Sequence, residues 1–463
     1  MEKIFGSFKD NHGNVLKLND RILRGLTNTG YSNFKKLLSD KILEKSIYEK
    51  FLINTWDVNS ELTELREKFN FEYYIEHEKI DFISYPYEWS FQQLKDAAIF
   101  HLNFQIFLLD RNYVLKDASA FNIQFEGSRP IFIDVTSIIP YQEGDVWNSH
   151  DQYCREFLNP LLLSSKKNVP FNNIYNGNLN GISTEELNNI FSIKDKLSLN
   201  IFLHIVLKSY FQKKEYNLDK INKISKKSIS KKSYKNILLS LKSWIKKLQV
   251  NKKNFFSLWK NYSEKNTYLN FQEHEKKQII KNFFKKNKIN NCLDIGCNTG
   301  EYTFVALENG LNKGIGIDSD HISLNSAYSK AKKLKSNFTP LYIDLLNPSP
   351  NRGWILKERD SFIGRYKFDS IIALAVIHHI CIGGNIKLDQ AVDFLINIAP
   401  KGLIEFVPKN DYTVKKMLGL REDIFSDYSE ENFMRCLEKS SNITNIFKIP
   451  ESDRKVFEFK KKS

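Results

Sequence analysis

The chain has 463 residues, 41% of them hydrophobic, and a formal net charge of +15 at pH 7. This length predicts two domains of about 100 to 200 residues each, and the apolar content excludes a disordered chain. The five cysteines form no CxxC pair, so neither a disulfide framework nor a zinc site is indicated. No secretory signal follows Met1, and the longest apolar stretches, such as residues 197–207, are too short to span a bilayer. We therefore expect a cytoplasmic protein.

The first predicted element is a hairpin in residues 13–26, "GNVLKLNDRILRGL", which offers three basic side chains as phosphate contacts: Lys17, Arg21 and Arg24. Residues 79–90 predict a strand and a hinge. The apolar pattern that follows them predicts a long helix that ends near residue 112.

The segment after this helix, "YVLKDASAFNIQFEGSRPIFIDVTS", spans residues 113–137 and spaces three polar residues in a distinctive way. Four residues separate Asp117 from Asn122, and Asp134 ends an apolar strand. This spacing resembles the catalytic loop and metal-binding segment of protein-kinase-like folds. The resemblance implies that Asp117 accepts the substrate proton, that Asn122 and Asp134 hold Mg²⁺, and that ATP binds here.

Those roles apply only if this half of the chain transfers phosphate. Lys116 stands where a kinase usually has arginine, "DVTS" replaces Asp-Phe-Gly, and the residues before the hinge contain no GxGxxG loop. The alternative is a pseudokinase that binds a substrate or supports the other domain.

Residues 220–262 contain many lysines and no acidic residue. Leucines at helical spacing, with lysines between them, predict an amphipathic helix with a solvated basic face. The alternative is a surface for nucleic acid, a phosphorylated substrate or an anionic membrane, although no interleaved aromatic pattern favours nucleic acid. This basic stretch separates two sets of motifs. The resemblance implies an α+β protein-kinase-like domain, or a pseudokinase, at 1–215. We expect a basic helical connector at 216–254 and a second domain at 255–463.

The second domain begins with "CLDIGCNTGEYTFVALENG", residues 292–310, which predicts a strand, a glycine-containing turn and a helix. The pattern D-x-G-x-N-x-G resembles motif I of class I S-adenosylmethionine-dependent methyltransferases, with asparagine in place of the middle glycine. Asparagine tolerates a left-handed backbone better than most residues. The resemblance implies that this turn binds the cofactor through Asp294, Gly296, Asn298 and Gly300.

Four further strands are expected, at 314–320, 338–346, 367–380 and 401–411. They alternate with helical patterns, which predicts an α/β Rossmann-like parallel sheet covered on both faces. Ligands of such sheets bind at the carboxyl ends of the strands. The resemblance implies that Asp318 holds the ribose and Asp344 the adenine, and it assigns Ala375 to the cofactor site.

Methyl transfer from a sulfonium requires a positioned acceptor and, for a hydroxyl acceptor, a base. His378 and His379 are expected at the end of the fourth strand, and histidine titrates in a suitable range. Neighbouring residues of an extended segment point to opposite sides, so we predict that only one acts, and we favour His379. Glu405 or Asp411 would replace it if neither does. The "ALAVIHH" sequence lacks the Asn/Asp-Pro-Pro-Tyr signature of many amino-group methyltransferases, which favours an oxygen acceptor.

The two halves together resemble a bacterial group of fused proteins, the NoeA-like nodulation methyltransferases, over most of the chain. The resemblance implies O-methylation of a glycan-linked or small-molecule acceptor. Two alternatives remain: a bifunctional kinase–methyltransferase that modifies a surface polysaccharide or a nodulation-type signal, and an RNA methyltransferase with a non-catalytic kinase-like scaffold.

Overall fold

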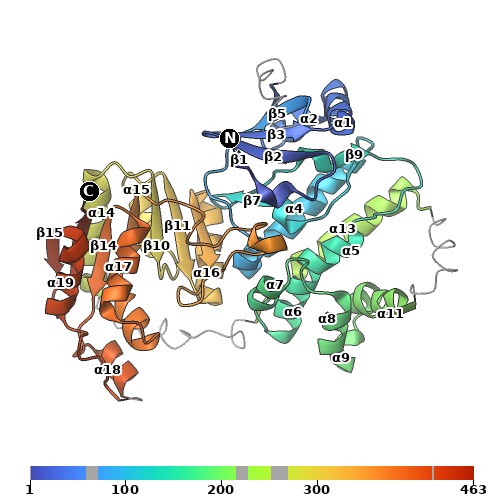
Figure 1. Cartoon of the computed structure of the whole chain (residues 1–463). Coiled ribbons are helices and arrows are strands. Elements are labelled where there is room, and N and C mark those ends of the chain that lie inside the picture. The colour runs from blue at the N-terminus through green and yellow to red at the C-terminus, as the bar shows by residue number, and fades with distance from the viewer. Residues whose placement is uncertain (1, 59–70, 215–227, 252–269, 420–421, 463) are drawn as a thin grey trace. The chain divides into compact units, whose positions relative to one another are not determined.

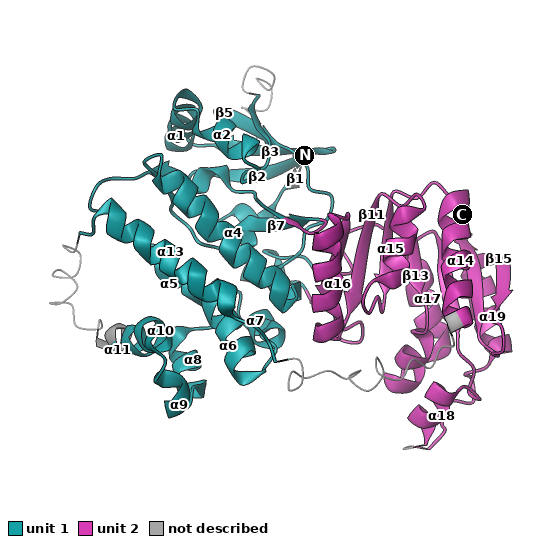
Figure 2. Cartoon of the chain, turned by 180° about the vertical axis from the view of Figure 1, so that it is seen from behind, with its two compact units in different colours: residues 1–126, 130–256, 351–360 teal, residues 127–129, 257–350, 361–463 magenta. Residues whose placement is uncertain are grey.

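The computed structural model describes residues 2–58, 71–214, 228–251, 270–419 and 422–462. The chain forms two compact units (Figures 1 and 2): unit 1 comprises residues 1–126, 130–256 and 351–360, and unit 2 comprises residues 127–129, 257–350 and 361–463. The expected boundary at 254/255 lies outside the described residues. In the described part of the chain, no helix has both the length and the apolar character needed to cross a bilayer.

Unit 1 begins with a five-stranded sheet of order β1-β2-β3-β5-β4 in which every neighbouring pair is antiparallel. Its strands are β1 (Glu2–Lys3), β2 (Gly13–Leu18), β3 (Arg21–Leu26), β4 (Thr55–Asp57) and β5 (Tyr73–His77). The hairpin expected at 13–26 is the β2–β3 pair, joined by a tight turn in which Asn19 has a φ of 52°. Helices α1 (Asn28–Ser39) and α2 (Ile42–Tyr48) follow β3.

The long helix expected before the polar segment is α4 (Phe91–Leu109), which begins with a capping box at Ser90 and Gln93. Two small strand pairs follow it: β6 (Tyr113–Leu115) with β9 (Ile138–Pro140), and β7 (Ile123–Glu126) with β8 (Arg129–Phe132). These strand pairs bring the loops at 116–122 and 133–137 close together. The two loops are joined by a hydrogen bond of 2.9 Å from Ile133 N to Asn122 O.

The rest of unit 1 is helical (Figure 1): α5 (His150–Tyr153), a π-helix (Cys154–Leu158), α6 (Asn159–Lys167), α7 (Asn172–Gly177), α8 (Thr184–Ile190), α9 (Ile193–Lys196), α10 (Leu199–Ile201), a second π-helix (Phe202–Val206), α11 (Leu207–Lys214) and α13 (Lys231–Lys247).

Helix α13 is the described part of the basic stretch, and it belongs to unit 1 rather than to a separate connector. It is amphipathic, as its leucine spacing predicts, and its apolar face is buried at Tyr234, Leu238, Leu241 and Ile245. Helix α13 packs along α4. Tyr234 Oη accepts a hydrogen bond of 2.7 Å from Gln105 Nε2. An apolar stripe of this kind needs a partner, and α4 provides it.

Unit 2 is a seven-stranded sheet of order β12-β11-β10-β13-β14-β16-β15. Its strands are β10 (Asn291–Ile295), β11 (Lys313–Asp318), β12 (Phe338–Tyr342), β13 (Ser370–Ala373), β14 (Lys401–Phe406), β15 (Ser441–Lys448) and β16 (Lys455–Lys461). The first five are parallel, and β16 runs antiparallel to both of its neighbours. Every residue of β10 and β13 is buried, which indicates a sheet covered on both faces.

The helices of unit 2 are α14 (Asn270–Lys286), α15 (Glu301–Glu308), α16 (His321–Leu334), α17 (Leu388–Ile398), α18 (Tyr412–Leu418) and α19 (Glu430–Ser440). Helix α14 packs on α15, and α17 packs on α19 (Figure 1). The apolar residues of α14 and α15 form a core cluster with buried residues of β10, β13 and β14. The parallel pairing of β10 to β14 places their carboxyl ends at one edge of the sheet.

All four of the further expected strands end earlier than predicted: β11 ends at Asp318 and β12 at Tyr342. For the other two, the difference changes the setting of their polar residues. The expected strand 367–380 ends at Ala373, and the expected strand 401–411 ends at Phe406. Ala375 has a left-handed φ of 54°, which ends the extended run. Asp411 is the N-cap of α18, where its side chain accepts a hydrogen bond from Thr413 N.

Candidate functional site

The turn after β10 has the backbone that motif I requires. Gly296, Asn298 and Gly300 have φ values of 72°, 48° and 81°. A Cβ at Gly300 would lie 2.4 Å from Phe338 Cε1, so this position excludes any side chain for steric as well as conformational reasons. Gly296 and Asn298 are exposed. The backbone of the turn is therefore exposed at these two positions, and its binding of the cofactor stays a prediction.

Asp318, at the end of β11, accepts hydrogen bonds of 2.8 Å from Asn298 N and from Asp320 N. The carboxylate thus joins the motif I turn to the turn that follows β11. Burial raises the pKa of Asp318 to about 6, against the opposing effect of the two backbone donors. The side chain is ionised at neutral pH and can accept hydrogen bonds there.

Asp294 lies within β10, below the turn, and is 2% exposed. Thr303 Oγ1 on α15 donates a hydrogen bond of 2.6 Å to Asp294 Oδ2. Burial raises the pKa of Asp294 to about 7. The carboxyl group therefore anchors the start of α15 and titrates near neutrality.

Asp344 and Ala375 follow β12 and β13 at the same edge. Asp344 is half-buried, and its Oδ1 accepts a hydrogen bond of 3.0 Å from Leu346 N. Next to it, Tyr342 stacks on His321 with ring centroids 4.2 Å apart. All the residues that the sequence assigned to the cofactor thus lie in the strand ends and turns of one sheet edge.

His378 and His379 were expected on an extended segment, where neighbouring side chains point to opposite sides. That expectation is wrong, because the segment is helical. His379 N and Ile380 N both donate to Val376 O, which starts a helical turn directly after Ala375. The rings of His378 and His379 lie 4.1 Å apart, centroid to centroid.

Their environments differ. His378 is fully buried, and neither ring nitrogen has a hydrogen-bond partner among the described residues. Burial lowers the pKa of His378 well below its ordinary value. His379 is half-buried, and burial, helped by the Arg454 guanidinium, lowers its pKa to about 4. Both imidazoles are neutral at pH 7, and only His379 is partly accessible.

A buried ionic network lies at the same end of the sheet. Lys276 Nζ on α14 lies 2.7 and 2.8 Å from the two oxygens of Glu405 on β14, and both side chains are at most 1% exposed. Arg454 binds Asp411 through two hydrogen bonds of 2.7 and 2.9 Å and lies 3.8 Å from Glu405 Oε1. The network therefore holds both of the carboxylates that were considered as alternative bases.

Lys276 and Arg454 were missed in the sequence. Lys276 lies 129 residues from Glu405, in a helix with many other lysines. No local pattern distinguishes it. Burial lowers the pKa of Lys276 to about 8, although Glu405 opposes this effect.

In unit 1, the structure brings together the residues of the kinase-like segment. Asn122 Nδ2 lies 3.4 Å from Asp134 Oδ2, and Ser137 Oγ donates a hydrogen bond of 3.3 Å to Asp117 Oδ2. Burial raises the pKa of Asp117.

Two side chains from the helical part of unit 1 support the loop that carries Asp117 and Asn122. Glu156 accepts hydrogen bonds from Ala120 N at 2.8 Å and from Ser119 Oγ at 3.0 Å. Gln152 Oε1 accepts one of 2.9 Å from Ala118 N. Both side chains belong to the helical turns at 150–158, and their hydrogen bonds stabilise the conformation of the loop.

Of the three basic candidates in the β2–β3 hairpin, Arg24 is the one that reaches this loop region. Arg24 Nη1 lies 2.8 Å from Asp10 Oδ2, 2.9 Å from Asp134 Oδ1 and 2.6 Å from Thr136 Oγ1. Lys17 is exposed, and Arg21 pairs with Glu76 through a hydrogen bond of 2.9 Å.

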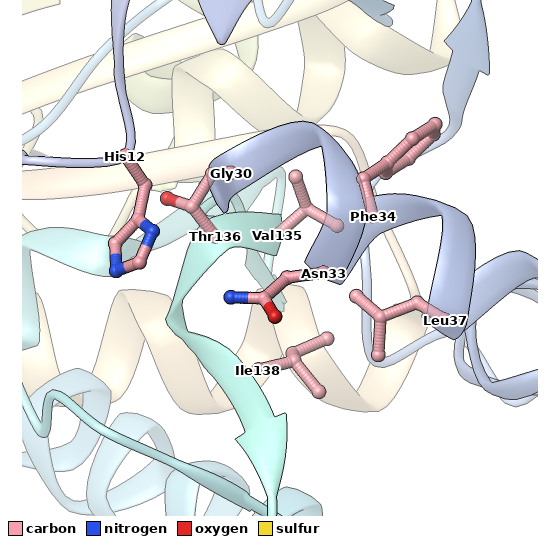
Figure 3. A pocket seen from close by; sticks show the side chains of 8 residues that line it. All are labelled: His12, Gly30, Asn33, Phe34, Leu37, Val135, Thr136 and Ile138. Atoms are coloured by element: carbon pink, nitrogen blue, oxygen red, sulfur yellow. The ribbon is translucent and has the colours of Figure 1, made fainter. Parts of the chain in front are cut away.

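A small pocket lies beside this cluster, between α1 and residues 135–138 (Figure 3). Its lining residues are His12, Gly30, Asn33, Phe34, Leu37, Val135, Thr136 and Ile138. Among the described residues, no group of three or more His, Cys, Asp or Glu side chains is arranged to hold a metal ion.

No family model matches the chain. In an alignment of 463 residues, it is 39% identical to the nodulation protein NoeA of Rhizobium meliloti (strain 1021), covering 99% of this chain and 96% of that protein. The chain belongs to the NoeA family. Its identity to NoeA extends through both units, so neither unit is an addition specific to this chain.

Part of the NoeA-family chain also matches several solved structures. The N-methyltransferase NodS from Bradyrhizobium japonicum WM9 is 15% identical with a TM-score of 0.32, covering 42% of this chain and 98% of NodS. Magnesium protoporphyrin IX methyltransferase from Synechocystis PCC 6803 is 17% identical with a TM-score of 0.30, covering 44% of this chain and 92% of that chain. Scores this low do not establish a shared fold. The fold of unit 2 in this NoeA-family chain is defined by its strand order.

Proposed function

We propose that this chain is an S-adenosylmethionine-dependent methyltransferase, with the reaction in unit 2 and a hydroxyl group of a glycan-linked or small-molecule acceptor as its substrate. The observation that carries the proposal is the left-handed turn at Gly296, Asn298 and Gly300, tied to Asp318 by the 2.8 Å bond from Asn298 N. An open backbone turn and a carboxylate at adjacent strand ends suit a nucleoside ligand. In the sheet, the antiparallel strand β16 lies between β14 and β15. This strand order is that of class I methyltransferases.

The residues present fit the cofactor. Asp318 is ionised at neutral pH, so its oxygens can accept from ribose hydroxyls. Asp344 follows the end of the neighbouring strand β12, where adenine would lie, and the left-handed turn at Ala375 brings backbone to the same edge. When bound, S-adenosylmethionine supplies an activated methyl group, so the protein's main task is to orient the acceptor.

His379 is the proposed acceptor-facing residue, because it is half-buried whereas His378 is enclosed. The imidazole is unprotonated at neutral pH, as a proton acceptor must be. Its pKa of about 4 makes it a weak base, so we propose that His379 takes the acceptor proton only as the methyl–oxygen bond forms. The ion-paired Glu405 and Asp411 fit this role less well, since each is already bound by a cation.

The class of acceptor is supported by family membership. The relative is named a nodulation protein, which agrees with a small signalling or surface glycan as the substrate. Incubation of the full chain with methyl-labelled S-adenosylmethionine and, in parallel, extracted glycans or RNA tests the proposal. Label should enter a base-stable methyl ether. Label in RNA instead would favour the scaffolded RNA methyltransferase.

We also propose that unit 1, with domain limits near 1 and 250, has a protein-kinase-like fold. Its antiparallel five-stranded sheet precedes the long helix α4, and two strand pairs then flank the loops with Asp117, Asn122 and Asp134. Arg24 on β3 is the basic residue that contacts Asp134. We do not assign phosphate transfer to unit 1, because the carboxylates that would hold a metal ion there are paired with Arg24.

A further inference from the structure

The acidic cluster of unit 1 contains its own cation. Asp10 and Asp134 both lie within 3.0 Å of Arg24 Nη1, at 2.8 and 2.9 Å. The Arg24 side chain is 7% exposed, so the guanidinium is enclosed between these carboxylates. Arginine stays protonated in proteins. Its positive charge therefore offsets one of the two carboxylate charges at every accessible pH.

Two further side chains lie against Asp134. Thr136 Oγ1 lies 2.6 Å from Asp134 Oδ1, and Asn122 Nδ2 lies 3.4 Å from Oδ2. The amide of Asn122 must present its nitrogen here, because its oxygen would repel the carboxylate. The surroundings of the cluster hold the pKa of Asp134 below its ordinary value: burial would raise it, but Arg24, Thr136, Lys116 and His77 together outweigh burial.

Asp10 places a negative charge at the position where the negatively charged phosphates of a nucleotide would bind. It lies in the segment between β1 and β2, and its Oδ1 is 3.5 Å from Lys116 Nζ. In the kinase-like arrangement proposed above, that segment covers the phosphates. A carboxylate there repels phosphate oxygens and also engages the two basic groups that could neutralise them.

We infer that Arg24 takes the place of a divalent cation between Asp10 and Asp134, and that unit 1 holds neither Mg²⁺ nor a Mg²⁺-bound nucleotide at this cluster. Magnesium needs near-octahedral oxygen ligands at about 2.0–2.1 Å. Here one oxygen of Asp134 is bound by a guanidinium, and the Asn122 oxygen faces away from the carboxylate. The residues that resemble a metal site do not fit the metal.

The cluster instead stabilises the contact between three segments of unit 1. It connects β3, the segment before β2 and the 134–136 turn, although Arg24 and Thr136 are 112 residues apart in the sequence. A permanent internal cation holds these segments together without any cofactor. Unit 1 is therefore suited to binding or support rather than to phosphate transfer. This inference does not depend on the methyltransferase activity of unit 2.

Electron paramagnetic resonance of Mn²⁺ tests the inference on the full chain. We expect that the wild-type protein and Asp134→Asn attenuate the free Mn²⁺ signal equally, with and without ATP. Stronger attenuation by the wild-type protein than by Asp134→Asn would overturn the inference. This comparison does not require any variant at Arg24 to fold.

A gain of metal binding provides the second test. In Arg24→Gln, the carboxylates of Asp10 and Asp134 lose their cation, so millimolar Mg²⁺ should raise the melting temperature of the variant by several degrees and leave the wild-type value unchanged. Adding Asp10→Asn should abolish that rise. The control Arg21→Gln, on the same strand but paired with Glu76, should show none. A folded Arg24→Gln protein that remains insensitive to Mg²⁺ would contradict the assignment of Arg24 as the substitute cation.

Discussion

The backbone N–H of Asn298 donates a hydrogen bond of 2.8 Å to Asp318 Oδ2, so the turn after β10 is held by the carboxylate that ends β11. Asn298 makes this bond within the left-handed turn, where its φ is 48°. The same carboxylate accepts from Asp320 N. The proposed ribose-binding residue therefore also shapes the proposed backbone cradle, and the two roles should be lost together.

Asp318→Ala should weaken binding of S-adenosylmethionine by about 1–3 kcal/mol, the range of a lost charge-assisted hydrogen bond. Isothermal titration calorimetry measures the change. Asp393→Ala, at an exposed position on α17, is the control and should leave affinity unchanged. Wild-type affinity should also fall as the pH drops below about 6, because Asp318 then becomes protonated. Equal affinities for wild type and Asp318→Ala would refute the cofactor site.

Asp294 predicts a pH dependence of the stability of unit 2. Burial raises its folded-state pKa from 3.8 to about 7, so the folded state binds the proton more tightly than the unfolded state. Its stabilising contribution is complete below pH ~4 and is lost as the pH rises through ~7. Asp294→Asn mimics the protonated form and can still accept from Thr303. The variant should therefore gain melting temperature relative to wild type at pH 8, and this gain should disappear at pH 4. A constant difference at both pH values would contradict the assignment.

Lys276→Met should be severely destabilising, by about 3–5 kcal/mol, because it leaves Glu405 buried without its partner. The double variant Lys276→Met/Glu405→Gln should recover much of this loss, since it removes both charges. Urea unfolding monitored on unit 2 measures both. Lys277→Met, next to it on α14 but 33% exposed, should change stability by less than about 0.5 kcal/mol. Additive losses in the double variant would show that the pair does not act as a unit.

His379→Ala should lower the methylation rate by about a hundredfold or more, the lower limit for a lost general base, with cofactor affinity retained. His378→Ala should act mainly on stability, because this side chain is fully buried. Single-turnover rates and cofactor titrations distinguish the two effects. If both variants turn over at nearly the wild-type rate, the enzyme works by positioning alone.

Local patterns in the sequence predicted most of the parallel sheet and the motif I turn, because glycine spacing and apolar runs are local signals. The end of β13 was not predicted. The apolar run through Ile377 continues from strand into helix, and periodicity cannot distinguish the two over so few residues. The left-handed conformation of Ala375 has no signature in the sequence. The partners Arg24–Asp134 and Lys276–Glu405 were missed because charged residues are common along the whole chain and long-range pairing leaves no local pattern.

The packing of α13 on α4 determines where the chain can be divided. Lys95 Nζ on α4 donates a hydrogen bond of 2.8 Å to Leu248 O, just beyond the end of α13, and this lysine is only 8% exposed. A fragment that stopped at residue 215 would lose this acceptor and would expose the apolar side of α4 that α13 covers. An isolated N-terminal fragment should therefore remain monomeric only if it extends past residue 250, and shorter fragments should aggregate.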